Sequence, residues 1–321
     1  MRTPRKKDNS GSSIYDDAFR TMMNNCLHLV IPVINEIFGK HYTGRERIYL
    51  LPNEHYINRQ DGLEQKRITD SAFKIISEDG TEEKYIFECQ STPDNTMLVR
   101  IFEYITQEAL DSGEIISNTL TVTISNSAVL FLRSNQNTPD IMKIVINTPG
   151  GTVKFDVPVM KMKNYSLDDI FGKGLYFLLP FYIFNFEKKF AVYEKDEKEF
   201  QTLKTEYENF MARLEEVLKN EKIYSFDWTT IMEMSRKVLE KIAKKYSILK
   251  EGVKNIMGGR VLEYPGSIVF NEGRLQGIAI GEGRGEQKNS FKVARKLRQL
   301  GINDAIICEA TALSPEDLKS L

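Results

Sequence analysis

The chain has few of the residues that build disulfide or zinc scaffolds. It contains three cysteines and three histidines in 321 residues. The cysteines, Cys26, Cys89 and Cys308, lie far apart, so we expect a reducing, cytoplasmic setting and no disulfide framework. The histidines show no zinc-ligand spacing with them, which argues against a structural zinc site.

Long apolar runs are also missing. No run approaches the roughly 20 residues that span a bilayer, so no membrane partner is expected. The most apolar stretch, 174–186, is short and contains Pro180, and it is predicted to be buried core. The first 13 residues are basic and small polar, with no apolar stretch behind them. We expect a disordered arm there and no secretory signal.

The charges nearly cancel. The net charge is −1, which by itself gives no support for nucleic-acid binding. Two local basic patches, in the N-terminal arm and in Lys288–Arg298, could contact phosphates. A solvated tail and a solvated helix face explain them equally well. The 41% hydrophobic and 28% charged residues are typical of a globular protein.

Apolar periodicity predicts helices on either side of a β-hairpin. Residues 16–38 have a helical pattern that ends at Gly39, with Pro32 as a potential kink. Residues 94–111 have a second helical pattern. Between them, 68–76 and 84–91 are rich in apolar and β-branched residues and flank an Asp-Gly pair, which predicts a hairpin.

This hairpin brings acidic residues together. Antiparallel pairing places Asp70 opposite the segment that contains Glu88 and Gln90. Strand alternation puts Glu88 and Gln90 on one face, and Phe87 and Cys89 on the other. Two carboxylates this close repel each other unless they share a proton or a cation, and hard oxygen ligands suit Mg²⁺. A surface cluster of acids on a hairpin is the structural alternative.

Further along, short strand patterns precede helical ones. Apolar runs at 119–124, 128–132, 141–146 and 152–158 predict strands, so the fold class is α/β or α+β, with a mixed sheet flanked by helices. Residues 195–250 predict two charged amphipathic helices, which pack on the core or on a partner helix, and packing on the core is favoured. The glycines at 273, 277, 281 and 285 are consistent with a close helix contact or with a flexible connector. Helical patterns at 290–300 and 305–310, and a helix start at 314–318, are consistent with a small helix-turn-helix-like unit.

The order of these motifs resembles a known family. Ile68-Thr69-Asp70, then Phe87-Glu88-Cys89-Gln90-Ser91, then Arg100–Tyr104 on a helix resemble the PD-(D/E)XK nuclease superfamily. Tyr15–Arg20 and the segment 294–321 are similar to the opening motif and the C-terminal end of its Rpn group. These are the recombination-promoting nucleases, also described as transposases.

The resemblance implies a restriction-endonuclease-like core that hydrolyses DNA phosphodiesters with Mg²⁺. Asp70, Glu88 and the carbonyl of Cys89 would bind the metal, and Asp16 would match the acid of the first helix. Arg100 and Tyr104 would contact the substrate. A homodimer is also expected, because cutting both strands usually takes two sites. The implied divisions are a basic arm (1–13), a nuclease-like core (14–192), charged helices (193–257), a Gly-rich connector (258–288) and a C-terminal helical unit (289–321).

Two positions depart from the superfamily pattern. No proline precedes Asp70, and Gln90 stands where the superfamily has a lysine. Glutamine cannot supply the positive charge of lysine, although it is typical of relatives in the Rpn group. Lys74 lies at an even offset from Asp70 and so on the same face of that strand. A catalytically silent DNA-binding or assembly protein, and more weakly a scaffold built on residues 195–250, are the rival hypotheses.

Overall fold

The computed structural model describes residues 14–51, 54–58, 64–68, 72–93, 96–258, 293–294, 297–298 and 303–311. Side chains between 52 and 71 lie outside this description. The chain divides into two compact units, Met1–Arg260 and Val261–Leu321. The predicted arm at 1–13 and the four spaced glycines are outside the described residues.

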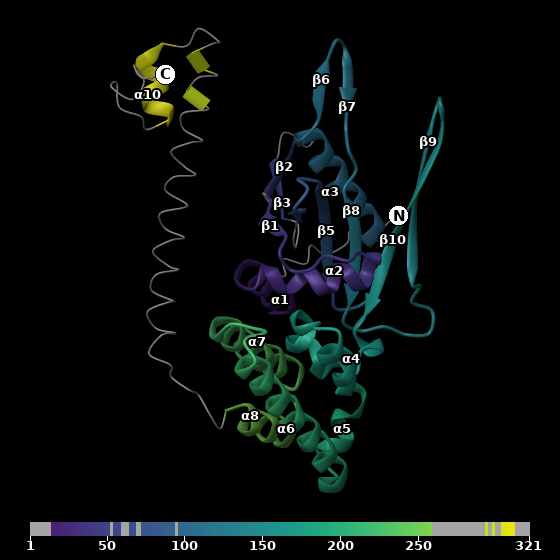
Figure 1. The fold of residues 1–321 in the computed structure, drawn as a ribbon, viewed down its shortest axis with the longest axis vertical. Coiled ribbons are helices and arrows are strands. Elements are labelled where there is room, and N and C mark those ends of the chain that lie inside the picture. Colours follow the sequence, from purple (N-terminus) through teal and green to yellow (C-terminus); the bar gives the residue numbers. More distant parts are fainter. Residues whose placement is uncertain are drawn as a thin grey trace, which may run out of the picture. The chain divides into compact units, whose positions relative to one another are not determined.

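A six-stranded mixed sheet forms the centre of the first unit (Figure 1). Its order is β1 (Arg47–Leu50), β4 (Ala72–Ile76), β5 (Glu82–Gln90), β8 (Asn126–Phe131), β10 (Gly151–Lys161) and β9 (Ile141–Thr148). The central strands β5, β8 and β10 are parallel, and the remaining pairs are antiparallel. The predicted mixed sheet flanked by helices is therefore confirmed.

The predicted hairpin forms between β4 and β5. Gly80 N–H donates to the Ser77 carbonyl at 3.0 Å, and Ser77 N–H donates to the Thr81 carbonyl at 2.9 Å. Gly80 has a φ of 86°, a left-handed conformation that costs glycine least. The turn sets the register of Ala72 opposite Ile86. Each side chain of the two strands is thereby assigned to one face of the sheet.

The helices at the start of the chain differ from the prediction. Residues 16–38 were expected to be one helix with a kink, but they form α1 (Ile14–Asn25), a 3₁₀ turn η1 (Leu27–Val30) and α2 (Ile31–Phe38). Pro32 lies in the first turn of α2, where its missing N–H costs no helical hydrogen bond. Proline therefore starts a second helix here. Gly39 ends α2 with a φ of 61°, as its position predicts.

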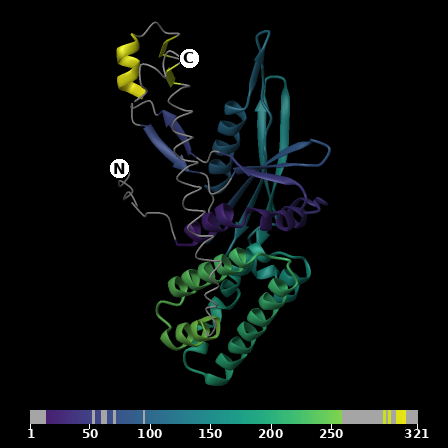
Figure 2. The ribbon, with the colours of Figure 1, turned by 60° about the vertical axis from the view of Figure 1, so that its left-hand side comes forward.

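A helical layer continues from the carboxyl end of β10. It contains η2 (Met162–Asn164), α4 (Leu167–Gly172), a run of 3₁₀ turns η3 (Tyr176–Lys189), α5 (Phe190–Tyr193), α6 (Glu197–Lys219), α7 (Ser225–Ile242) and α8 (Ser247–Gly258). In both views α6, α7 and α8 lie at one end of the sheet (Figures 1 and 2). The helix α6 packs closely on α8, because a Cβ added to Gly252 would lie 2.4 Å from Cζ of Phe200.

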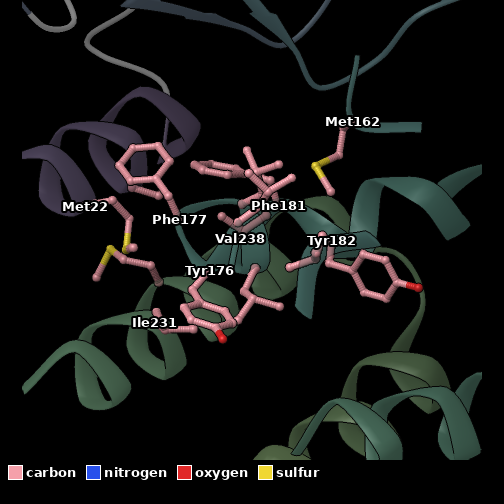
Figure 3. Packing of buried hydrophobic residues seen from close by; sticks show 14 of the residues in the cluster. Met22, Met162, Tyr176, Phe177, Phe181, Tyr182, Ile231 and Val238 are labelled. Carbon is pink, nitrogen blue, oxygen red and sulfur yellow. The ribbon is translucent and has the colours of Figure 1, made fainter. Parts of the chain in front are cut away.

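One large apolar cluster joins this layer to the sheet. It contains Phe177 and Phe181 of η3, Met22 of α1, and Ile231 and Val238 of α7 (Figure 3). The apolar stripe of α6, with Phe200, Leu203, Tyr207, Phe210 and Leu214, is buried in the same cluster. The charged helices therefore pack on the core, which was the favoured prediction. The predicted burial of 174–186 is confirmed as well.

The opposite face of the sheet has a smaller cover. There α3 (Met97–Asp111) packs Met97, Ile101 and Ile105 against strand residues that include Ile86 and Val129. We call this the small cluster and the one around η3 the large cluster. The two clusters lie on opposite faces because neighbouring residues of a strand point to opposite sides.

Several elements were not predicted. They are β1, a hairpin of β2 (Glu54–Asn58) and β3 (Glu64–Ile68), and the strand β6 (Glu114–Ile116), which pairs with β7 (Thr119–Thr121). In the second unit α10 spans Asp304–Thr311, where a helix at 305–310 was expected. Buried Ala294 and Ile307 pack together there, with Leu297 and Cys308 beside them. The predicted helix start at 314–318 is outside the described residues.

Candidate functional site

Glu88 is a buried carboxylate on a central strand. It lies on β5, between β4 and β8, and is paired in register with Val129. Only 2% of the residue is exposed. Its neighbours on this face of the sheet include Ile86 and Phe131, both members of the small cluster. A carboxylate among apolar side chains costs free energy unless a cation or hydrogen bonds compensate, so this position is typical of a functional site.

Asp70, the predicted partner of Glu88, is outside the described residues, as is Thr69. The described pairing next to it is the one the prediction requires. Ala72 pairs with Ile86. Asp70 precedes Ala72 by two positions, and Glu88 follows Ile86 by two. That Asp70 meets Glu88 stays a prediction.

The predicted alternation along β5 is confirmed. Phe87 and Cys89 belong to the large cluster, whereas Ile86 belongs to the small cluster with which Glu88 and Gln90 share a face. Gln90 is half-buried, and its backbone carbonyl accepts a hydrogen bond from Leu132 N–H at 2.9 Å. Successive carbonyls of a strand point in opposite directions, so the Cys89 carbonyl is directed to the β4 side.

Arg100 and Tyr104 lie on α3, on the same face of the sheet as Glu88. Tyr104 is 7% exposed and packs in the small cluster. Nε of Arg100 is buried and has no hydrogen-bond partner among the described residues, while Nη2 lies 4.0 Å from the sulfur of Met97. A buried guanidinium nitrogen that lacks a partner is suited to binding an anion.

Asp16 lies on the other side of the sheet. The ring of Phe19, three residues later on α1, is 5.3 Å from that of Phe87. Phe87 points away from Glu88 into the large cluster, so α1 covers the face opposite the Glu88 side chain. The structure thus groups Glu88, Gln90, Arg100 and Tyr104 on one face and places Asp16 on a helix over the other.

Lys74 does not replace the missing lysine. Its Nζ lies 2.8 Å from Oε2 of Glu82, near the turn end of the hairpin. In the β4–β5 register Lys74 is opposite Lys84, four residues before Glu88 on β5. Lys84 in turn contacts Glu108 of α3 at 2.7 Å.

The Glu108 carboxylate is a second buried acid beside the small cluster. It accepts a hydrogen bond from Nζ of Lys84 and is also hydrogen-bonded by the hydroxyl of Ser125. Only 10% of its side chain is exposed. Its partners are all protein groups, so Glu108 has a structural explanation.

A third carboxylate, Glu83, faces the large-cluster side near the turn. It accepts hydrogen bonds from Lys40 at 2.6 Å and from the hydroxyls of Tyr42 and Tyr85. Partial burial raises the pKa of Glu83, but the three donated hydrogen bonds outweigh it and lower the pKa from 4.5 to about 2. Burial and the hydrogen bond to Glu83 raise the pKa of Tyr42 to about 12.

Arg133, which the sequence analysis did not single out, lies at the carboxyl end of β8. Its Nε and Nη2 contact the two carboxylate oxygens of Glu187 at 2.5 and 2.7 Å. The guanidinium also lies over the rings of Tyr15 and Phe184, at 5.5 and 4.7 Å from their centroids. The sequence signal that could have identified Arg133 is its position just after a predicted apolar strand.

A metal site is only partly defined by these residues. Within the described part of the chain, no group of three or more His, Cys, Asp or Glu side chains could hold a metal ion. That part supplies the Glu88 carboxylate and, on the β4 side, the Cys89 carbonyl. Two oxygen donors on adjacent residues of one strand fit a magnesium site, provided that Asp70 completes it.

None of the described helices is long and apolar enough to cross a membrane. Scans of the chain against protein-family models, curated proteins and solved structures found no match.

Proposed function

We propose that the protein is a Mg²⁺-dependent DNA endonuclease of the PD-(D/E)XK superfamily, close to the Rpn recombination-promoting nucleases, and that it acts in the cytoplasm. The observation that carries the proposal is the buried Glu88 on the central strand β5. Glu88 lies two residues beyond Ile86, the last β5 residue whose pairing with β4 is described. The order helix, hairpin, helix and parallel strand supports it, because it matches the order of the superfamily motifs along the chain.

Asp70, Glu88 and the Cys89 carbonyl would hold the metal. When bound, Mg²⁺ lowers the pKa of a coordinated water and offsets negative charge on the phosphate. The protein's own side chains position the reactants. Gln90 can hydrogen-bond a water but adds no charge, and the unpartnered Nε of Arg100 can bind a non-bridging phosphate oxygen. Tyr104, one turn further along α3, would help orient the substrate.

Plasmid nicking in Mg²⁺ tests the proposal. Glu88→Gln keeps the size of the side chain and removes its charge, and we expect at least a roughly hundredfold loss of nicking. Asp70→Ala should lose as much. Glu82→Gln is the matched control, because Glu82 lies on the same strand and the same face but pairs with Lys74 at the turn end. Equal nicking by wild type and Glu88→Gln would remove this site from the reaction.

The rival proposal is a catalytically silent DNA-binding or assembly protein derived from such a nuclease. Gln90 favours it, because the position lacks the lysine charge. DNA binding without nicking by either wild type or Glu88→Gln would support this rival. The scaffold hypothesis has less support, since the apolar stripe of α6 is buried within the first unit.

The homodimer stays a proposal as well. It predicts that the mass measured by light scattering is twice that of the chain at the concentrations where nicking occurs. A monomer that nicks only one strand would contradict it.

A further inference from the structure

A cavity of about 370 Å³, lined by both apolar and polar side chains, lies at the carboxyl edge of the parallel strands. Its lining includes Arg133 and Ser134, which follow β8, and Lys163, which follows β10. The end of η3 contributes Asn185, Glu187 and Lys188. In open α/β sheets, ligands bind outside the carboxyl ends of the strands, and this cavity is in that place.

The charge of the cavity suits an anion. The charge of Glu187 is neutralised by its two contacts with the Arg133 guanidinium. That guanidinium also lies over the rings of Tyr15 and Phe184. Lys163 and Lys188 are exposed, and the single contact described for Lys163 is a 3.4 Å hydrogen bond to the Asn135 carbonyl. Two lysines therefore supply positive charge that no carboxylate of the lining offsets.

Two buried polar atoms of the lining have no hydrogen-bond partner among the residues that the structure describes. They are Oγ of Ser134 and Oδ1 of Asn185. The Asn185 amide nitrogen already donates to the Tyr165 carbonyl at 3.0 Å, which orients Oδ1 as a free acceptor. A hydroxyl can donate to a phosphate, whereas an amide oxygen requires an N–H or O–H from the ligand. Together they match a nucleotide, which carries a phosphate and base N–H groups.

The cavity is connected to the strand that carries Glu88. The N–H of Arg133 donates to the Ser91 carbonyl at 3.0 Å. Ser91 follows Glu88 by three residues, which is about 10 Å along an extended strand. The Glu88 side chain lies on the small-cluster face, whereas Leu132 and Phe184 of the cavity belong to the large cluster, so a DNA strand that contacts both sites passes the carboxyl edge of the sheet.

We infer that this cavity binds one nucleotide of the DNA strand, at a site separate from the metal site. Lys163, Lys188 and Ser134 contact the phosphate, and Oδ1 of Asn185 accepts a base N–H. The identity of the ligand as DNA rests on the proposed function. The binding itself requires no cleavage and is measured separately.

The test is titration of a fluorescent 12-nucleotide oligodeoxythymidylate at several salt concentrations, without divalent metal. We expect Lys163→Ala/Lys188→Ala to weaken binding about tenfold and to reduce the salt slope by about 1.4. The double variant Lys143→Ala/Lys154→Ala is the control, because it removes the same charge from the β9–β10 hairpin. Ser134→Ala should weaken binding several-fold without changing the slope, since it removes a hydrogen bond and no charge.

Equal weakening by the two double variants would overturn the inference. Thymidine 5′-monophosphate and inorganic phosphate are tested as competitors. Competition by the mononucleotide at lower concentration than phosphate supports a nucleotide, and equal competition overturns it. If the lysine variants weaken the mononucleotide but not the oligonucleotide, a free nucleotide is the ligand and the DNA strand is excluded.

The outcomes separate the cavity from the nuclease. The nicking assay of wild type and Glu88→Gln reports on the nuclease, and the oligonucleotide titration reports on the cavity. If neither protein nicks DNA while Lys163→Ala/Lys188→Ala still binds more weakly than its control, the cavity stands and the nuclease falls. If wild type nicks DNA and the two double variants bind alike, the nuclease stands and the cavity falls.

Discussion

The two faces of the central sheet are built from different residues. Toward η3 and α1, the described strands contribute apolar and aromatic side chains to the large cluster: Phe73, Ile75, Tyr85, Phe87, Cys89, Ala128, Leu130, Leu132 and Met160. Toward α3, the same strands bury Glu88, Ser127 and Lys161 beside the small cluster. The charged groups thus lie under the thinner cover. The apolar face supplies most of the stability, and the α3 face carries the candidate metal site.

The largest expected effect is on the apolar face. Phe19 is fully buried, and its ring contacts those of Phe87, Phe177 and Phe181. We expect Phe19→Ala to lower the free energy of unfolding by about 3–5 kcal/mol, and Ile101→Ala on α3 by about 2–3 kcal/mol. Urea denaturation measures both. If Ile101→Ala lowered the free energy of unfolding more than Phe19→Ala does, the apolar face would not be the main source of stability.

A smaller effect is expected at the buried ion pair of the α3 face. Glu108→Gln removes the charge that Lys84 contacts, and we expect a loss of about 2–3 kcal/mol in the free energy of unfolding. The exposed pair of Lys74 and Glu82 is the control, and Glu82→Gln should cost at most about 1 kcal/mol. A double-mutant cycle with Lys84→Met isolates the pair. If the coupling energy between Lys84 and Glu108 were smaller than that between Lys74 and Glu82, burial would not strengthen the ion pair.

Metal binding should stabilise the protein through the same face. At a concentration about 100 times Kd, Mg²⁺ adds about 2.7 kcal/mol to the free energy of unfolding. Wild type and Glu82→Gln should therefore melt several degrees higher in Mg²⁺, and Glu88→Gln should not. Differential scanning calorimetry with Mg²⁺ and with EDTA measures this. An equal rise in Glu88→Gln would place the bound metal elsewhere.

The smallest effect concerns acid on the other face. The pKa of Glu83 is lowered from 4.5 to about 2 in the folded protein. Its stabilisation is therefore fully present above pH 4.5 and is lost as the pH falls toward 2. With 30% of the side chain exposed, we expect about 1–2 kcal/mol. Denaturation at pH 5, 4 and 3 should show a steeper loss for wild type than for Glu83→Gln. Parallel curves would rule out this contribution.

Local pattern was enough to predict the hairpin and its faces. The Asp-Gly turn sets the register of Ala72 with Ile86, and period-2 alternation then assigns Phe87 to one side and Glu88 to the other. The same alternation could not show that α1 covers the Phe87 side. That depends on the contact of Phe19 with Phe87, which are 68 positions apart in the numbering and related only by tertiary packing.

The cavity at the carboxyl edge could not be predicted from local sequence patterns either, because it also depends on tertiary packing. Arg133 and Glu187 are separated by 54 positions, and their pairing follows from the parallel order of β5, β8 and β10. Parallel pairing leaves no turn signal in the sequence, because its crossovers are long. The local pattern around Pro32 gave a wrong prediction, because a proline within a helical pattern can either kink one helix or begin the next.

The cysteines give the sheet an internal reporter. Cys26 and Cys89 are both 0% exposed within the large cluster, and Cys89 is the residue after Glu88. A thiol is alkylated only when it reaches solvent as a thiolate, so labelling of Cys89 must wait for β5 to separate from the layer that covers it. The rate of that labelling, compared with the rate for Cys26, therefore measures how often the strand that carries Glu88 opens.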